Sequence, residues 1–215
     1  MTTTTTTSER IRFTRRVTGI EISPTLAVLN RAHELVAKGV DVVDLGPGEP
    51  DFATPQFIAD AGKRAIDAGQ TKYTNALGTQ ALRDAIAARY NRRYGTKVRC
   101  ENVIAGTGGK QELFNVVLAL VDDGDEVIIP SPYWVSFPDQ VSFAGGRPVF
   151  APTDAENHFR PTLASIESMA SERTRGVIIN SPCNPTGAVI DEAELGRIVE
   201  WCASRGIFLM YDETY

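Results

Sequence analysis

The chain has 215 residues, of which 42% are hydrophobic and 23% charged, so it can fill a folded core and is not a disordered polymer. A formal net charge of −5 argues against general affinity for nucleic acids, which requires a basic surface. The longest uncharged apolar run, Leu113–Val121, falls far short of the roughly 20 residues that a membrane-spanning helix needs. Three cysteines without a CxxC pair and only two histidines predict no disulfide framework and no metal site, and they favour a reducing cytoplasm.

Residues 1–14 form a Thr- and Arg-rich tail that begins with the homopolymer Thr2–Thr7. Six consecutive threonines offer no core side chains, and we expect this tail to be disordered. Its Ser, Thr and Arg bias also faintly resembles an organelle transit peptide, which remains an alternative.

Three helices are expected next, because each apolar periodic segment has a start signal and a stop signal. Ser or Thr followed by Pro caps and opens the first two, and a glycine closes all three. The segments run from Ser23–Pro24 to Gly39, from Thr54–Pro55 to Gly69, and from about Gly78 to Tyr94.

Beyond residue 100, short apolar runs alternate with helical patterns. Such continuous runs, without polar alternation, are typical of strands buried on both faces. We therefore predict an α/β fold with a mainly parallel sheet and helices on both of its faces. The expected strands are Val103–Ala105, Glu126–Ile129, Gly176–Ile179 and Ile207–Tyr211, with helices over Lys110–Val121 and about Asp191–Ser204.

Polar and aromatic residues follow each predicted strand, where open α/β sheets bind their ligands. They offer a glycine turn, an aromatic plate, a side-chain amide, a carboxylate and a phenol, which together suit a flat, phosphorylated, nitrogen-containing ring. The four segments are Gly106–Lys110, Ser131–Trp134, Asn180–Gly187 and Asp212–Tyr215.

The glycine turn is neither of two familiar phosphate motifs. A P-loop fails because Ile104 and Gln111 replace its first glycine and its Ser or Thr, and the dinucleotide pattern fails at Gln111. What remains is a strand, a glycine turn and a helix that direct backbone N–H groups at an anion. A tight turn without any ligand is the alternative.

Three further residues have both a functional and a structural interpretation. Asp212 ends a buried strand and needs a partner, either a protonated pyridine nitrogen or the backbone N–H groups of a helix start. Trp134 is either a cofactor-stacking ring or a core aromatic. Asn184 lies between two prolines and before Gly187, a restraint that few ordinary loops need.

Several motifs, in this order, resemble the fold-type I, class-I aminotransferases that use pyridoxal phosphate, and are most similar to the bacterial aspartate aminotransferase branch. The resemblance covers about Arg15 to Tyr215. It implies that residues 15–50 are the N-terminal segment of a small domain and residues 51–215 an incomplete cofactor-binding large domain. The motifs are Leu45–Phe52, Tyr73–Thr74 with Gly78, Leu82–Arg83, Gly108–Gln111, Gly124–Val127, Pro132–Ser136 and Asn180–Gly187.

The resemblance also implies roles for individual residues. The backbone of Gly108, Gly109 and Lys110 would hold the cofactor phosphate, and Tyr73 would reach the phosphate of a neighbouring subunit. Trp134 would stack on the ring, Asn184 and Tyr215 would bind the ring oxygen, and Asp212 would pair with the ring nitrogen. Asp212, Tyr215 and Trp134 are thus the expected catalytic residues, and Gly48, Trp134 and Asn184 the expected substrate-binding ones.

The family needs a lysine that forms an imine with the cofactor, downstream of the segment that ends at Tyr215. None of the five lysines is placed there, so the chain is expected to be an N-terminal portion that is inactive alone. The implied reaction moves an amino group from aspartate to 2-oxoglutarate in a cytoplasmic homodimer. The alternatives are relatives acting on alanine, aromatic amino acids, kynurenine or prephenate, a non-catalytic regulator, and a degenerate structural relative.

Overall fold

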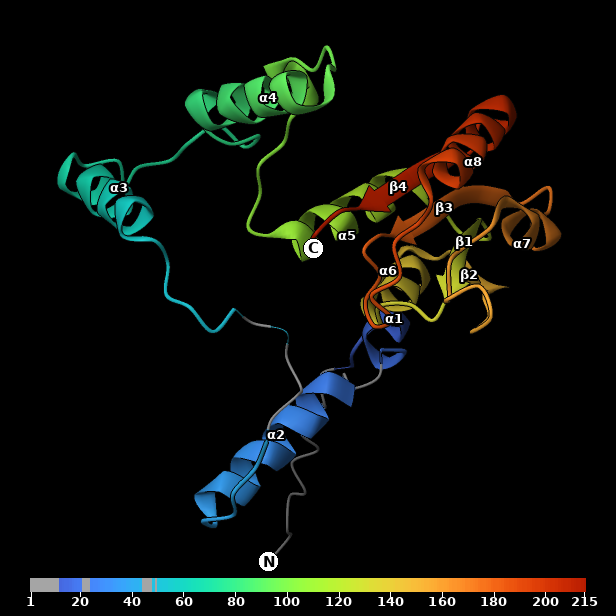
Figure 1. The fold of residues 1–215 in the computed structure, drawn as a ribbon, viewed down its shortest axis with the longest axis horizontal. Coiled ribbons are helices and arrows are strands. Elements are labelled where there is room, and N and C mark those ends of the chain that lie inside the picture. Colours follow the sequence, from blue (N-terminus) through green and yellow to red (C-terminus); the bar gives the residue numbers. More distant parts are fainter. Residues whose placement is uncertain (1–11, 21–23, 44–47, 49) are drawn as a thin grey trace, which may run out of the picture. The chain divides into compact units, whose positions relative to one another are not determined.

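The computed structural model describes residues 12–20, 24–43, 48 and 50–215 (Figure 1). Its internal contacts divide the chain into two compact units. One unit contains Phe114–Tyr215 and the described residues before Ile22, and the other is Ser23–Leu113. The predicted disordered tail lies mostly outside the described residues. Residues 45–47 and 49 of the motif Leu45–Phe52 also lie outside them. The predicted domain boundaries at residues 14/15 and 50/51 stay predictions.

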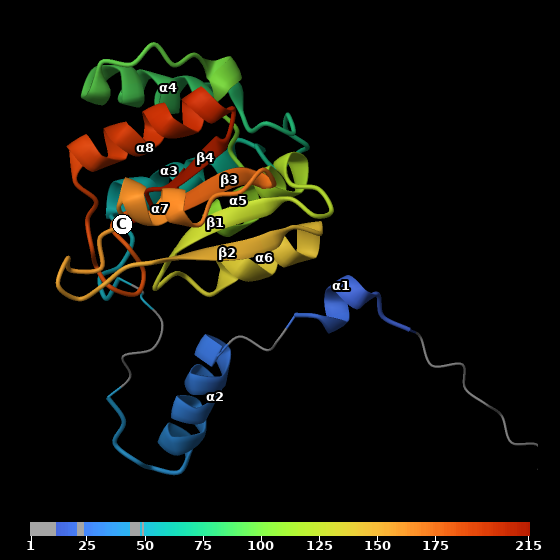
Figure 2. The same ribbon diagram turned by 90° about the vertical axis from the view of Figure 1, so that its right-hand side faces the viewer.

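A four-stranded parallel sheet forms the centre of the first unit, in the order β2-β1-β3-β4 (Figure 2). Three helices connect successive strands, which is the arrangement that parallel strands require. The strands are β1 (Glu126–Ser131), β2 (Arg147–Pro152), β3 (Thr174–Asn180) and β4 (Phe208–Asp212), and the helices are α6 (Ser136–Ala144), α7 (Leu163–Ser168) and α8 (Glu192–Arg205). A short helix, α1 (Arg15–Thr18), contacts α6.

Both faces of this sheet are covered. Successive residues of a strand point to opposite faces, yet Val127, Ile128 and Ile129 of β1 are all buried. Ile128 belongs to a core cluster with Ile166 of α7 and Ile198 of α8, while α6 contacts β1 and β2. The α/β fold with a parallel sheet and helices is thereby confirmed.

The pair β3–β4 is close-packed at its amino end, where Gly176 lies opposite Phe208. A Cβ atom at Gly176 would lie 2.1 Å from Cζ of the Phe208 ring, and no real Cβ makes such a contact. The glycine therefore provides the space in which the Phe208 ring lies.

Glu126 is a buried carboxylate at the start of β1, with its side chain only 1% exposed. It accepts hydrogen bonds from Arg147 at 2.6 Å, from Ser171 at 2.7 Å and from Arg173 at 2.7 Å. These donors, with Arg147 first among them, lower the pKa of Glu126 to about 2 in spite of its burial. The carboxylate is thus charged and satisfied, at the amino ends of the strands.

The second unit is helical. It comprises α2 (Pro24–Ala37), α3 (Gln56–Asp67), α4 (Gln80–Tyr94), the 3-10 turn η1 (Cys100–Asn102) and the start of α5 (Gly109–Leu120). The predicted helices are confirmed to within about two residues at each end. None of the described helices combines the length and apolarity needed to span a bilayer.

The predicted strand Val103–Ala105 is wrong, because the segment joins no sheet in the described structure. Its Ala105 N–H instead donates to the carbonyl of Leu77 at 2.9 Å. A strand exists only where a neighbour pairs with its backbone, which three apolar residues cannot guarantee. Conversely, β2 was not predicted, since an edge strand that contains Pro148 and Pro152 has a mixed burial pattern instead of a continuous apolar run.

Candidate active site

The sheet order creates a switch point between β1 and β3. The chain leaves β1, runs outward to the edge strand β2, and returns to pair β3 with the other side of β1. Ligands of open α/β sheets bind at the carboxyl ends of the two strands that flank such a point. The segments that leave these ends carry Trp134 after β1 and Asn184 after β3.

Asn184 and Tyr215 meet at this edge. The Asn184 Nδ2 group donates to the Tyr215 hydroxyl at 3.3 Å, although one follows β3 and the other follows β4. An amide with a second N–H and a hydroxyl that can itself donate are able to bracket one ligand oxygen.

Asp212 is the last residue of β4 and pairs with Asn180 of β3 in the sheet register. Its Oδ1 atom accepts hydrogen bonds from the Thr214 N–H at 3.2 Å and the Thr214 hydroxyl at 2.6 Å. Among the described residues, its Oδ2 atom accepts none. One carboxylate oxygen is therefore fixed locally and the other is left for a positive or donor partner.

Trp134 is half-buried and packs against the buried Phe137 of α6. The ring centroids are 5.3 Å apart and the planes are nearly perpendicular at 86°. The neighbouring Tyr133 stacks on Phe150 of β2, with centroids 4.8 Å apart. These contacts fix the segment after β1, so Trp134 has both its predicted position at the strand end and a packing role.

The glycine turn Gly106–Lys110 lies in the second unit, which is described by itself. Gly108 adopts φ +111°, which favours glycine, and α5 begins at Gly109. The first N–H groups of a helix have no intrahelical acceptor and so can bind an anion. The Thr107 N–H, by contrast, is occupied by the Gln111 side-chain oxygen at 2.9 Å. The Gln111 and Glu112 N–H groups bond to the Gly108 carbonyl at 3.0 and 3.3 Å, so the predicted anion donors are the N–H groups of Gly108, Gly109 and Lys110.

The remaining predicted site residues lie in the same second unit. Tyr73 is fully exposed in the segment between α3 and α4, and Gly48 is exposed next to residues outside the described ranges. The structure thus groups Asn184, Tyr215 and Asp212 and places Trp134 after the end of β1. Tyr73 and Gly48 belong to the second unit and are described separately.

Arg83 is a residue that the patterns did not single out for a role. It is buried on α4, and its guanidinium donates to the Cys100 carbonyl at 2.7 and 3.2 Å and to the Val103 carbonyl at 3.0 Å. These bonds hold the segment that leads into Gly106. A buried guanidinium is recognisable in a structure, but a single arginine in a helical sequence gives no such signal.

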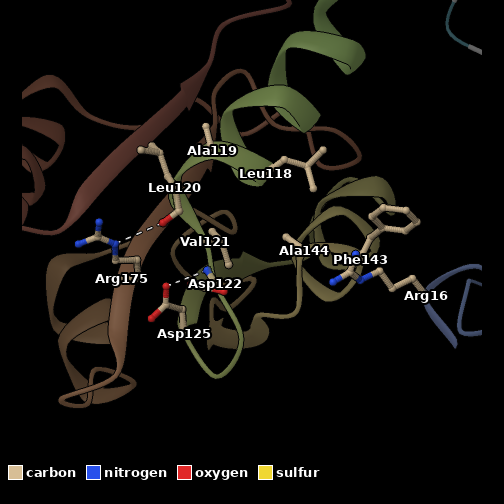
Figure 3. Close-up of a pocket in the computed structure, with 10 residues that line it drawn as sticks. All are labelled: Arg16, Leu118, Ala119, Leu120, Val121, Asp122, Asp125, Phe143, Ala144 and Arg175. Carbon is tan, nitrogen blue, oxygen red and sulfur yellow. Dashed lines mark hydrogen bonds between the residues drawn. The ribbon is translucent and has the colours of Figure 1, made fainter. Parts of the chain in front are cut away.

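A cavity of about 620 Å³ lies elsewhere, at the opposite end of the first unit (Figure 3). It is bordered by Arg175 near the start of β3, by the ends of α5 and α6, and by Arg16. None of the predicted site residues lines it. A second cavity, of about 20 Å³, lies beside Tyr133, Asn180 and Cys183 at the carboxyl edge. The predicted site residues Asn184, Tyr215 and Asp212 therefore lie at a different edge of the sheet from the larger cavity.

Among the described residues, no group of three or more His, Cys, Asp or Glu side chains is arranged to hold a metal ion. The three cysteines, Cys100, Cys183 and Cys202, are unpaired. Burial raises the pKa of the Cys202 thiol to about 11, so this thiol stays protonated and unreactive near neutral pH.

The chain is similar in sequence and in fold to known aminotransferases. The family model "aminotransferase class I and II" matches residues 40–215. The chain is 46% identical over 200 residues to a probable aspartate/prephenate aminotransferase of Aquifex aeolicus, covering 93% of this chain and 51% of the relative. It is 42% identical over 205 residues to an aspartate aminotransferase of Bacillus subtilis, covering 95% and 52%.

A solved structure shows the same fold. The aspartate aminotransferase from Thermus thermophilus with maleate superposes with a TM-score of 0.93 at 42% identity, covering 95% of this chain and 54% of that one. The chain thus spans about half the length of the relatives it matches. The family resemblance seen in the motifs is confirmed, and the chain belongs to the aminotransferase class I and II family.

Proposed function

We propose that this protein is an aminotransferase that moves the amino group of L-aspartate to 2-oxoglutarate, with its cofactor ring held at the carboxyl ends of β1, β3 and β4. Pyridoxal phosphate is the cofactor of this family. The observation that carries the proposal is the grouping of Asn184, Tyr215 and Asp212 at the carboxyl edge of the sheet, next to its switch point.

The residues present fit pyridoxal phosphate. Its phenolic oxygen matches the Asn184–Tyr215 pair, and its ring nitrogen matches the Oδ2 atom that Asp212 leaves without a local donor. Its phosphate matches the start of α5, where Gly108, Gly109 and Lys110 would supply backbone N–H groups. When bound, the protonated ring accepts the electron pair released as the substrate Cα loses its proton.

The chain's own residues would then have distinct tasks. The Asp212 carboxylate holds a proton on the ring nitrogen, since a negative charge nearby favours the protonated form. Asn184 and Tyr215 orient the ring oxygen, and Trp134 covers the ring and keeps water away. Gly48 would present its backbone to the substrate carboxylate, and Trp134 and Asn184 would also contact the substrate.

Aminotransferases bind amino acids and 2-oxo acids, and the relatives' names suggest which ones. The Bacillus subtilis relative is an aspartate aminotransferase, which supports aspartate as the donor. The Cereibacter sphaeroides relative, 47% identical, is an aspartate/prephenate aminotransferase, and this favours prephenate as a second acceptor. Turnover with each oxo acid would separate the two acceptors.

We further propose a cytoplasmic homodimer, with a small domain that includes residues 15–50 and a large domain from residue 51. The fully exposed Tyr73 supports the dimer, since it is free to reach the cofactor of a partner subunit. The apolar side chains of Phe57 and Ile66 on α3 are also exposed, which favours their burial against a partner subunit. Sedimentation equilibrium tests the dimer, and three unpaired cysteines support the compartment.

The cofactor assignment is tested by titrating the purified 215-residue chain with pyridoxal 5′-phosphate and following the shift in cofactor absorbance. We expect saturable binding that Asn184→Ala weakens about tenfold, the loss of about one hydrogen bond. The matched control is Asn157→Ala, which removes the hydrogen bond from Asn157 Nδ2 to the Arg160 carbonyl at 3.2 Å. Absence of saturable binding by the unaltered chain would contradict the proposal.

Catalysis by this polypeptide is a separate matter, because its five lysines all precede Asp212. We expect the purified 215-residue chain to bind the cofactor and yet to show no aspartate-dependent formation of glutamate. A coupled assay for oxaloacetate measures this, and turnover above a heat-denatured control would refute it.

A further inference from the structure

The carboxamide of Asn180 connects the two segments that carry the proposed ring-binding residues. We propose that Asn180 is a positioning residue, which sets the spacing between Asn184 and Asp212. The inference rests on the proposed function, since the spacing matters because one ring must reach both residues.

Asn180 makes one hydrogen bond to each segment. Its Nδ2 group donates to the backbone carbonyl of Asp212 at 3.2 Å, and its Oδ1 atom accepts from the backbone N–H of Asn184 at 2.7 Å. A carbonyl can only accept and an N–H can only donate, so only one orientation of the amide satisfies both. The side chain is partly buried between the segments.

The two bonds differ in how far the structure depends on them. The Asp212 carbonyl also accepts from the Ser181 N–H at 3.0 Å, so it keeps one partner without Asn180. The N–H of Asn184 has Asn180 as its acceptor. The start of the Asn184 segment is therefore held to the sheet through this side chain.

The consequence for the ring follows from which groups are joined. Asn184 is proposed to act at the ring oxygen and Asp212 at the ring nitrogen, which are two positions on the edge of one rigid, planar ring. Small displacements of such contacts weaken binding strongly, because both must be made at once. Asn180 would act through the two residues that are proposed to contact the ring.

Two substitutions separate the two bonds. Asn180→Ala removes both, while Asn180→Asp keeps an acceptor for the Asn184 N–H and places an oxygen against the Asp212 carbonyl. Hydrogen exchange of the Asn184 amide in the cofactor-free chain reports the first contact. Titration with pyridoxal 5′-phosphate reports the effect on the site, and Asn157→Ala is again the control.

We expect Asn180→Ala to speed exchange of the Asn184 amide at least tenfold and to weaken cofactor binding about tenfold. Asn180→Asp should leave that amide protected and still weaken binding. Unchanged Asn184 exchange in Asn180→Ala would overturn the inference, as would wild-type affinity in Asn180→Asp. If Asn180→Ala fails to fold, Asn180→Asp decides the question. If the unaltered chain binds no cofactor, the proposed function fails, while the exchange result still decides the role of Asn180.

Discussion

The amide of Asn184 donates to the hydroxyl of Tyr215 at 3.3 Å across 31 residues of sequence. Neither residue lies in a strand, and the parallel pairing of β3 with β4 brings their segments to the same edge. The distance between them is thus a product of sheet topology. Each residue contributes one polar group to a shared position, so removing either should affect ligand binding in a similar way.

Tyr215→Phe tests this pair with a minimal change. The substitution removes the hydroxyl and leaves the ring, so Asn184 loses its acceptor and the cofactor oxygen loses a donor. A net hydrogen bond contributes about 0.5–1.5 kcal/mol, which predicts roughly a twofold to tenfold loss of affinity. Cofactor titration of the 215-residue chain measures it, and Tyr90→Phe on α4 gives a tyrosine control. Equal affinities for Tyr215→Phe and the unaltered chain would count against the shared oxygen site.

Asp212→Ala separates binding from chemistry. The phosphate and ring-oxygen contacts stay in place, so cofactor affinity should fall only modestly. The partner that keeps the ring nitrogen protonated is gone, and turnover should fall about a hundredfold or more, within the usual range for positioned proton-transfer groups. The measurement needs a polypeptide that also includes the lysine that this family links to the cofactor. Undiminished turnover there would remove Asp212 from the mechanism.

Glu126 makes the stability of the first unit depend on pH. Its pKa is lowered to about 2 in the folded chain, against 4.5 as its ordinary value. Its contribution is therefore complete above about pH 4.5 and is lost as the pH falls toward 2. Because Arg147 and Arg173 are more than half exposed, we expect roughly 1–3 kcal/mol at pH 7.

Glu126→Gln should lose that stability at pH 7 and show a flatter dependence of unfolding free energy between pH 5 and pH 2. Urea denaturation at several pH values measures both quantities. Glu156→Gln, on an exposed loop, is the control. Parallel pH profiles for Glu126→Gln and the control would exclude this linkage.

Arg83→Met should loosen the entry to the glycine turn. The change leaves the buried Val103 carbonyl without its donor, which costs about 1–3 kcal/mol, while the Cys100 carbonyl keeps the hydrogen bond from the Val103 N–H at 3.1 Å. We expect faster hydrogen exchange at the Ala105 amide, which bonds to Leu77. Arg92→Met makes the same change at an exposed position of α4, and identical exchange in the two variants would argue against anchoring by Arg83.

Much of the fold followed from local signals. Start signals and glycine stops predicted α2, α3 and α4 because those signals act within a few residues of the helix ends. Strand order is different, since an apolar run indicates burial but says nothing about its neighbours. For that reason Val103–Ala105 was wrongly expected to be a strand, and the switch point between β1 and β3 emerged only in three dimensions.

In the candidate site, too, local features were predictable from the sequence and long-range contacts were not. Trp134, Asn184 and Asp212 were accessible to sequence reasoning because each follows an apolar run, and their individual roles remain predictions. The linking role of Asn180 was not accessible, since it depends on a backbone carbonyl 32 residues away. A side chain that binds backbone carries no signature in residue type or spacing.

The close contact of Gly176 with Phe208 has a consequence at the far end of the same two strands. It sets their alignment, and four residues later that alignment brings Asn180 opposite Asp212. A slip of one residue would put Tyr211 or Glu213 there and turn every side chain of β4 to the other face. The absence of a side chain at Gly176 thus helps to fix the register of β3 and β4, and with it the position of Asp212 at the opposite edge of the sheet.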